Sequence, residues 1–104
     1  MSFDTLIEKI KEKDNPTVVG LDPKLEYVPT FIVEGAIAKH GETLKAAAKA
    51  IYKFNKELIN ALYDVVPAIK PQCAYYEMYG HEGVKTLYKT IQYAKKRGMY
   101  VITD

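Results

Sequence analysis

Residue types that mark several specialised protein classes are scarce in this chain of 104 residues. Cys73 is the only cysteine, which excludes an internal disulfide and a metal site built from several cysteines. No apolar run approaches the roughly 20 residues that cross a bilayer. The first residues also lack the basic and then apolar segments of a signal peptide. We therefore expect a cytoplasmic protein with no membrane partner.

An excess of charge of one sign is also missing. The 15 basic and 13 acidic residues leave a formal net charge of +2, and no basic cluster is interleaved with aromatic residues along the chain. We therefore expect no nucleic acid partner. The hydrophobic content of 48% argues against disorder, and the length predicts one domain over residues 1–104.

Metal-ligating residues are too sparse to predict a metal site. His40 has no histidine, cysteine or carboxylate at a ligand spacing, and we expect it at an exposed helix end. His81 is expected beside an exposed helix start. We interpret Cys73 as a small packing residue, because no base lies near it in the sequence.

Three short apolar segments each end in a charged residue, and they are the feature that organises the chain. The segments are Thr17–Leu21 followed by Asp22, Val66–Ile69 followed by Lys70, and Met99–Thr103 followed by Asp104. Helical sequence separates them, and this alternation predicts an α/β fold with a parallel sheet. Chemistry in such sheets lies beyond the carboxyl ends of the strands. Asp22, Lys70 and Asp104 should therefore converge on one rim.

Apolar periodicity predicts the helices between these strands. A short helix is expected from Ser2 or Asp4 to about Lys13, and a second over Thr30–Lys39. A third, over Thr43–Val65, should bury Leu44, Ala47, Ala48, Ile51, Phe54, Leu58, Leu62 and Val65, with its lysines facing outward. A fourth, from about Glu82 to Arg97, should bury Val84, Leu87, Tyr88, Ile91, Ala94 and the stem of Lys95, and end at Gly98. The second strand should run into a loop between Lys70 and Glu77. The Val-Val-Gly-Leu run of the first strand has no polar alternation, so we expect that strand to be covered on both faces.

Lys70 is the least expected of the three charged residues. A buried ammonium needs an anionic partner or loses its proton, whereas a lysine whose stem alone is buried can extend its charge to the surface. Because two carboxylates are expected on the same rim, we favour a functional role for Lys70.

Three strands alone would leave unpaired edges. A complete barrel of alternating strands and helices takes about 250 residues. We therefore expect the first three units of a (β/α)8 TIM barrel, an N-terminal part that more chain, a second polypeptide or self-association completes.

The motifs at the strand ends resemble one enzyme family over the whole chain. The segments that carry this resemblance are Val19-Gly-Leu-Asp-Pro23, Ala68-Ile-Lys-Pro-Gln72 with Tyr75-Tyr-Glu77, and Val101-Ile-Thr-Asp104. The Phe54–Asn60 helix is also similar. These segments resemble orotidine 5′-phosphate decarboxylase, in the bacterial branch with Lys-Pro-Gln on the second strand.

The resemblance implies a homodimeric barrel that converts orotidine 5′-phosphate to UMP and CO2 in pyrimidine biosynthesis, without a metal or organic cofactor. By position, Asp22 would bind the ribose or base region of the nucleotide. Lys70 would contact ribose hydroxyls and a neighbouring aspartate. Asp104 would be the first residue of the family's Asp-x-Lys-x-x-Asp motif.

The proton-donating lysine and the second aspartate of that motif are not among residues 1–104. We therefore expect this chain alone to be inactive. Two alternatives stay open: a related sugar-phosphate decarboxylase of the same barrel group, and a non-catalytic α/β module that associates through its sheet edges.

Overall fold

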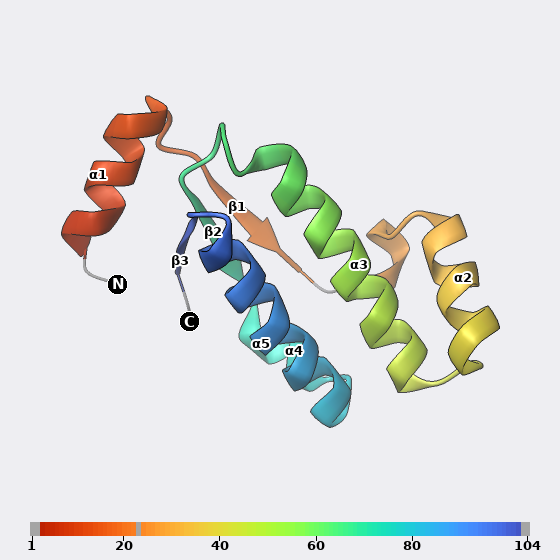
Figure 1. Cartoon of the computed structure of the whole chain (residues 1–104). Coiled ribbons are helices and arrows are strands. Elements are labelled where there is room, and N and C mark those ends of the chain that lie inside the picture. Colours follow the sequence, from red (N-terminus) through yellow and green to blue (C-terminus); the bar gives the residue numbers. More distant parts are fainter. Residues whose placement is uncertain (1–2, 23, 103–104) are drawn as a thin grey trace.

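Three parallel strands form the centre of the fold in the computed structural model, which describes residues 3–22 and 24–102 (Figure 1). The sheet has the order β1–β2–β3, and the strands span β1 (Val18–Leu21), β2 (Ala68–Pro71) and β3 (Tyr100–Val101). Gly20 pairs with Lys70, and Ile69 pairs with Val101. The predicted parallel sheet is confirmed.

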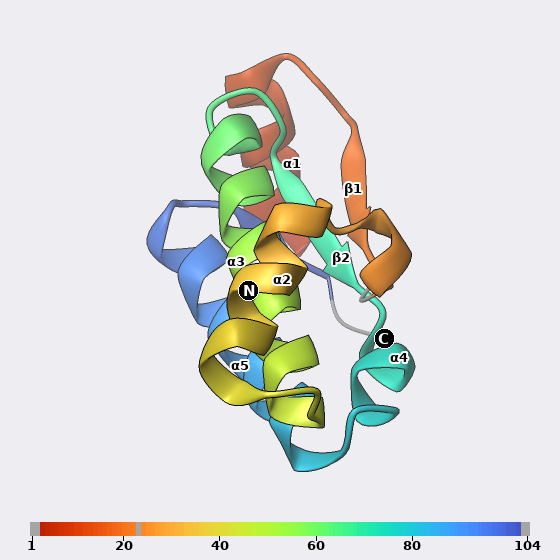
Figure 2. The same ribbon diagram turned by 90° about the vertical axis from the view of Figure 1, so that its right-hand side faces the viewer.

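Two long helices cover one face of this sheet. They are α3 (Leu44–Leu62) and α5 (Gly80–Lys96), which lie on the same side of β1 and β2 (Figure 2). The buried core between the layers consists of Leu21, Ile59, Val66, Ile69, Ala94 and Met99. The remaining helical segments are α1 (Phe3–Lys13), the 3₁₀ turn η1 (Leu25–Tyr27), α2 (Thr30–His40) and α4 (Cys73–Glu77).

Strand β1 is covered on one face only, and the prediction that it is covered on both faces is wrong. Val19 packs against the α3/α5 core, whereas Val18 is 38% exposed. Gly20 is exposed, and a Cβ added to it would meet nothing within 4 Å. Strand side chains alternate between the two faces. The face of the sheet that points away from α3 and α5 therefore carries Val18, Gly20 and Lys70, and it is exposed along β1, although Ala68 in β2 is buried.

A second buried cluster connects the segment after β1 to the helices. It consists of Val28, Ile32, Ala50, Ile51 and Tyr76, which come from the η1–α2 segment, α3 and α4. This cluster packs the short helix α4 against α3, directly beyond the carboxyl end of β2.

Helix α5 buries the predicted Ala94, but the rest of its buried stripe differs from the predicted one. Its buried residues are Gly83, Thr86, Thr90 and Ala94, whereas Val84 is 47% exposed and Tyr88 is 64% exposed. The small side chains face α3 where that helix buries alanines, and the Thr86 hydroxyl donates to the Ala48 carbonyl over 3.2 Å. Close approach of the two helices favours small residues at these positions over larger apolar ones.

Helix ends follow their local capping signals. The Thr43 hydroxyl accepts a hydrogen bond from the Ala46 amide over 3.1 Å and starts α3. Gly98 has a φ of 84°, and the Met99 amide donates to the Ala94 carbonyl over 3.0 Å. Such a left-handed residue commonly ends a helix, so the predicted end of α5 is confirmed. Leu44 and Val65, at the two ends of the apolar stripe predicted for α3, are exposed, so the prediction that they are buried is wrong.

The segment after β2 is helical rather than a loop. Cys73–Glu77 forms α4, in which the Tyr75 amide donates to the Gln72 carbonyl over 3.1 Å. Tyr76 is fully buried, and this burial accounts for the helical turn that returns its ring to the core. Cys73 is half-buried, and its thiol lies 3.8 Å from the Pro71 carbonyl oxygen.

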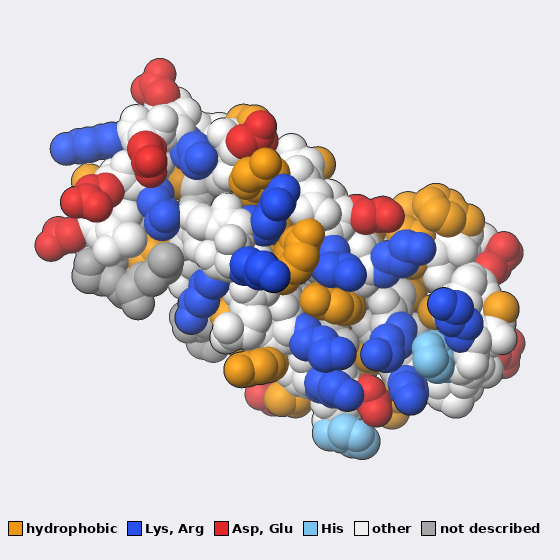
Figure 3. Space-filling model, viewed as in Figure 1, with side chains coloured by type: hydrophobic (Ala, Val, Ile, Leu, Met, Phe, Trp, Pro, Cys, Tyr) orange, Lys and Arg blue, Asp and Glu red, His pale blue; other side chains and the backbone are white. Residues whose placement is uncertain are grey.

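Lysines gather on the outer side of α3 and α5 (Figure 3). The pKa of Lys49 is lowered, mainly because Lys89 places a second positive charge nearby, with burial as a further cause. Lys56 lies 4.9 Å from the centre of the Tyr52 ring. Within residues 3–22 and 24–102, no helix has the length and apolarity to cross a bilayer.

The contact between α4 and α5 depends on the missing side chain of Gly83. A Cβ at this position would overlap the Tyr76 carbonyl and lie 2.8 Å from Tyr79 Cβ. We expect Gly83→Ala to lower the free energy of unfolding by about 1–3 kcal/mol, because backbone must move to admit the methyl group. Urea unfolding followed by circular dichroism measures the change.

A matched control is Gly35→Ala in α2, where an added Cβ meets nothing within 4 Å. We expect it to be neutral or to stabilise the chain by up to about 1 kcal/mol. Equal effects of the two substitutions would contradict the packing described for Gly83.

Candidate active site

Two of the three predicted site residues lie where neighbouring strands end. Asp22 directly follows β1 and is half-buried, and Lys70 lies in β2 opposite Gly20, also half-buried. Partners in register point to the same face of a sheet, and residues two apart share a face. Gly20 and Lys70 therefore share the face of the sheet that points away from α3 and α5, and Asp22 follows at the same rim. Asp104 lies outside the residues that the structure describes.

The carboxyl end of β1 is fixed by a buried polar network. The Tyr76 hydroxyl donates to the Leu21 carbonyl over 3.2 Å. Asn55 Nδ2 donates to the Tyr76 hydroxyl over 2.9 Å and to Thr90 Oγ1 over 3.3 Å. Asn55 is 2% exposed, and Tyr76 and Thr90 are fully buried. Helices α3, α4 and α5 thus converge on the peptide group that precedes Asp22.

Tyr76 acts in this network as a neutral donor. Burial raises its pKa to about 12, opposed by the hydrogen bond from Asn55 and reinforced by the negative charge of Asp22. Its hydroxyl is therefore protonated throughout the neutral range. It can hold a carbonyl oxygen but cannot serve as a base there.

A hollow of about 230 Å³ lies beside this end of β1. It is lined by Gly20, Leu21, Asp22, Tyr27, Phe54, Asn55 and Leu58. A carboxylate, a buried amide and two aromatic rings thus share one surface. The Lys24 ammonium lies 5.5 Å from the centre of the Tyr27 ring. Such a mixture of polar groups and rings suits a ligand that combines a flat ring with hydroxyl groups.

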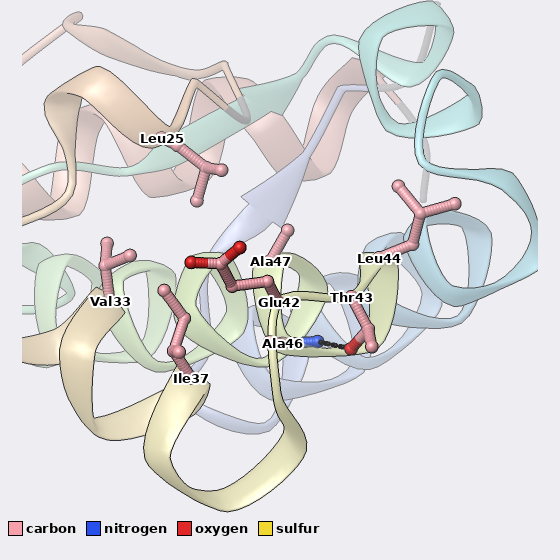
Figure 4. Close-up of a pocket in the computed structure, with 8 residues that line it drawn as sticks. All are labelled: Leu25, Val33, Ile37, Glu42, Thr43, Leu44, Ala46 and Ala47. Atoms are coloured by element: carbon pink, nitrogen blue, oxygen red, sulfur yellow. Dashed lines mark hydrogen bonds between the residues drawn. The ribbon is translucent and has the colours of Figure 1, made fainter.

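A larger hollow, of about 380 Å³, lies away from the strand ends. Its walls come from η1, α2 and the start of α3, and they are mostly apolar, with Glu42 at the rim (Figure 4). The lining residues are Leu25, Val33, Ile37, Glu42, Thr43, Leu44, Ala46 and Ala47. It contains none of the predicted site residues and offers little for recognition of a polar substrate.

The described part of the chain holds no group of three or more histidine, cysteine, aspartate or glutamate side chains able to bind a metal ion. The His81 side chain is 91% exposed and lies 3.3 Å from a carboxylate oxygen of Glu82. His40 is half-buried at the end of α2.

Sequence reasoning missed the residues that hold β1. Asn55 was left out of the apolar stripe of α3, although it lies four residues after Ile51 and four before Ile59, both buried. That spacing places it on the buried face. A polar residue at such a position needs hydrogen-bond partners, and this was the available signal. Tyr76 lies in the Tyr75-Tyr-Glu77 segment that carries the resemblance, but that segment does not indicate its hydrogen bonds, and Thr90 gave no signal.

The raised pKa of Tyr76 predicts an alkaline loss of stability. The unfolded chain titrates this hydroxyl at its ordinary value of 10.0, whereas the folded chain keeps it protonated to about 12. The stability that the neutral hydroxyl contributes is therefore complete below pH 10.0 and is lost as the pH rises through about 12. Urea unfolding at stepped alkaline pH should show this fall.

We expect Tyr76→Phe to be less stable than wild type at neutral pH and to show a smaller alkaline fall. Tyr88→Phe, at a ring that is 64% exposed, should keep the wild-type alkaline profile. An unchanged fall in Tyr76→Phe would contradict the role of this hydroxyl.

Comparison with known proteins gives a consistent result. No family model matches the chain. Curated orotidine 5′-phosphate decarboxylases match it along nearly its whole length. The protein of Clostridium novyi is 37% identical over 102 residues, which cover 98% of this chain and 32% of that protein. The protein of Petrotoga mobilis is 36% identical over 104 residues, covering 100% of this chain and 33% of that protein.

Solved structures extend the comparison to the fold. A proposed orotidine 5′-phosphate decarboxylase of Streptomyces avermitilis has a TM-score of 0.69 and 25% identity, covering 97% of this chain and 31% of that chain. A Toxoplasma gondii protein with a TM-score of 0.74 and 22% identity supports the fold alone. The chain spans about a third of the length of the curated relatives. Its strands and helices correspond to the N-terminal part of their TIM barrel. The chain is homologous to the N-terminal third of the orotidine 5′-phosphate decarboxylases.

Proposed function

We propose that this chain supplies the first three βα units of an orotidine 5′-phosphate decarboxylase, whose complete barrel converts orotidine 5′-phosphate to UMP and CO2. The observation that carries the proposal is the register of β1 and β2. This register brings Asp22 and Lys70 to one rim. The relatives that match nearly the whole chain are named orotidine 5′-phosphate decarboxylase.

Asp22 and Lys70 are the substrate-binding residues in this proposal. The hollow beside Asp22 offers the carboxylate to ribose hydroxyls and the Phe54 and Tyr27 rings to a flat base. Lys70, opposite Gly20, supplies positive charge and hydrogen-bond donors at the same rim. Asp104 is the third site residue, assigned by its place in the motif.

The chemistry explains why these residues are not sufficient. Loss of CO2 leaves electron density on a ring carbon with no adjacent carbonyl to accept it. The protein must therefore offer preorganised positive charge and a proton donor. In the family that this chain resembles, the donor is the lysine two positions after the aspartate that Asp104 matches. Residues 1–104 alone should bind nucleotide weakly and not turn it over.

The remaining features of the proposal follow the family. The complete enzyme works without a metal or organic cofactor, as a homodimer in the cytoplasm. The outer edges of β1 and β3, the first and last strands of the described sheet, are where further strands of the barrel would pair.

A chimera tests the proposal directly. Residues 1–104 replace the matching N-terminal third of the Clostridium novyi relative, and decarboxylation is followed by loss of the orotate chromophore. We expect turnover, because the relative supplies the missing lysine and this chain supplies Asp22 and Lys70. Lys70→Ala and Asp22→Asn should each lower kcat/KM by about 100-fold or more.

Lys53→Ala, at an exposed lysine of α3, is the matched control and should keep the activity of the chimera. Residues 1–104 alone should show no turnover. A folded chimera without activity, or one that tolerates Lys70→Ala, would overturn the proposal.

A further inference from the structure

We propose that Tyr76 is a positioning residue for Asp22, and that Asn55 and Thr90 hold Tyr76 in the orientation that this role needs. The substrate-binding role of Asp22 rests on the proposed function. The hydrogen bonds from which the positioning role of Tyr76 is argued are independent of that function.

The direction of each hydrogen bond in the network is determined. The two protons of Asn55 Nδ2 go to the Tyr76 hydroxyl, over 2.9 Å, and to Thr90 Oγ1, over 3.3 Å. Because the Tyr76 oxygen accepts from Asn55, its own proton is available for the Leu21 carbonyl at 3.2 Å. Thr90 thus helps to orient Asn55, and Asn55 orients Tyr76.

The acceptor at the end of this network is the peptide group that leads into Asp22. The Leu21 carbonyl is coplanar with the Asp22 amide, so fixing one fixes the other. The Gln72 amide donates to the same carbonyl over 3.4 Å, and the Lys24 amide donates to the Asp22 carbonyl over 2.9 Å. Asp22 is therefore held from both sides, in a fixed relation to the strand that carries Lys70.

A purely structural role explains this arrangement less well. Burying three polar side chains costs desolvation that an apolar cluster would avoid, and the cost is offset only when every partner is in place. The network ends at the strand terminus that presents a candidate site residue. Asn55 and Asp22 also line the same hollow.

A test on the chain itself uses amide NMR and hydrogen exchange of the 15N-labelled protein. Tyr76→Phe should shift the Leu21 and Asp22 amide signals. It should also speed exchange of the Gln72 amide by about five- to tenfold beyond any change in the slowest core amides.

Tyr93→Phe is the matched control, because the Tyr93 hydroxyl also bonds an asparagine of α3, Asn60, over 2.6 Å, at an exposed site. It should leave the Leu21, Asp22 and Gln72 signals unchanged. If Tyr76→Phe does not fold, Thr90→Val, which removes only the second anchor of Asn55, should still shift the Asp22 amide. A uniform loss of protection with no change at Asp22 would overturn the proposal.

A double-mutant cycle in the chimera separates positioning from general stability. Tyr76→Phe should lower kcat/KM by about tenfold, because misplacement of a substrate-binding group is costly. In an Asp22→Asn background, Tyr76→Phe should lower kcat/KM by less than about twofold, because the effects of two substitutions that act through the same group are not additive. Equal losses in both backgrounds would overturn the positioning role. An inactive chimera would sink the proposed function alone, because the NMR test still decides the role of Tyr76.

Discussion

The hydrogen bond from Tyr76 to the Leu21 carbonyl is the contact on which the candidate site depends. It connects a fully buried side chain to the last peptide of β1, over 3.2 Å. Asn55 completes the connection from α3, so helices α3 and α4 are both tied to one strand end. Core packing alone would hold the layers together without fixing the peptide that leads into Asp22.

The second constraint is the register of the sheet. Pairing of Gly20 with Lys70 places residues separated by fifty positions on one rim. Helices α3 and α5 cover the opposite face of the sheet. In a barrel the face that points away from the helices is interior, and the strand ends surround the active site. The exposure of Val18 and Gly20 is therefore consistent with homology to a third of a longer barrel.

The strands, their parallel order and the positions of Asp22 and Lys70 could be predicted from the sequence, because apolar runs and helical periods are local signals. The buried face of α5 could not be predicted in the same way. Hydrophobic side chains such as Val84 and Tyr88 indicate one face, whereas close packing against α3 requires small side chains such as Gly83 and Thr90. The polar network was equally hidden. Its hydrogen bonds join residues 21 to 55 positions apart, and no local pattern reports such pairs.

The most direct test of this account is the strand register itself, measured by cross-strand nuclear Overhauser effects in the isotopically labelled chain. The account predicts contacts that pair Gly20 with Lys70 and Ile69 with Val101. A register shifted by one residue, with Gly20 opposite Ile69 or Pro71, would contradict it. Such a shift would turn Lys70 toward α3 and α5 and away from the face that carries Gly20.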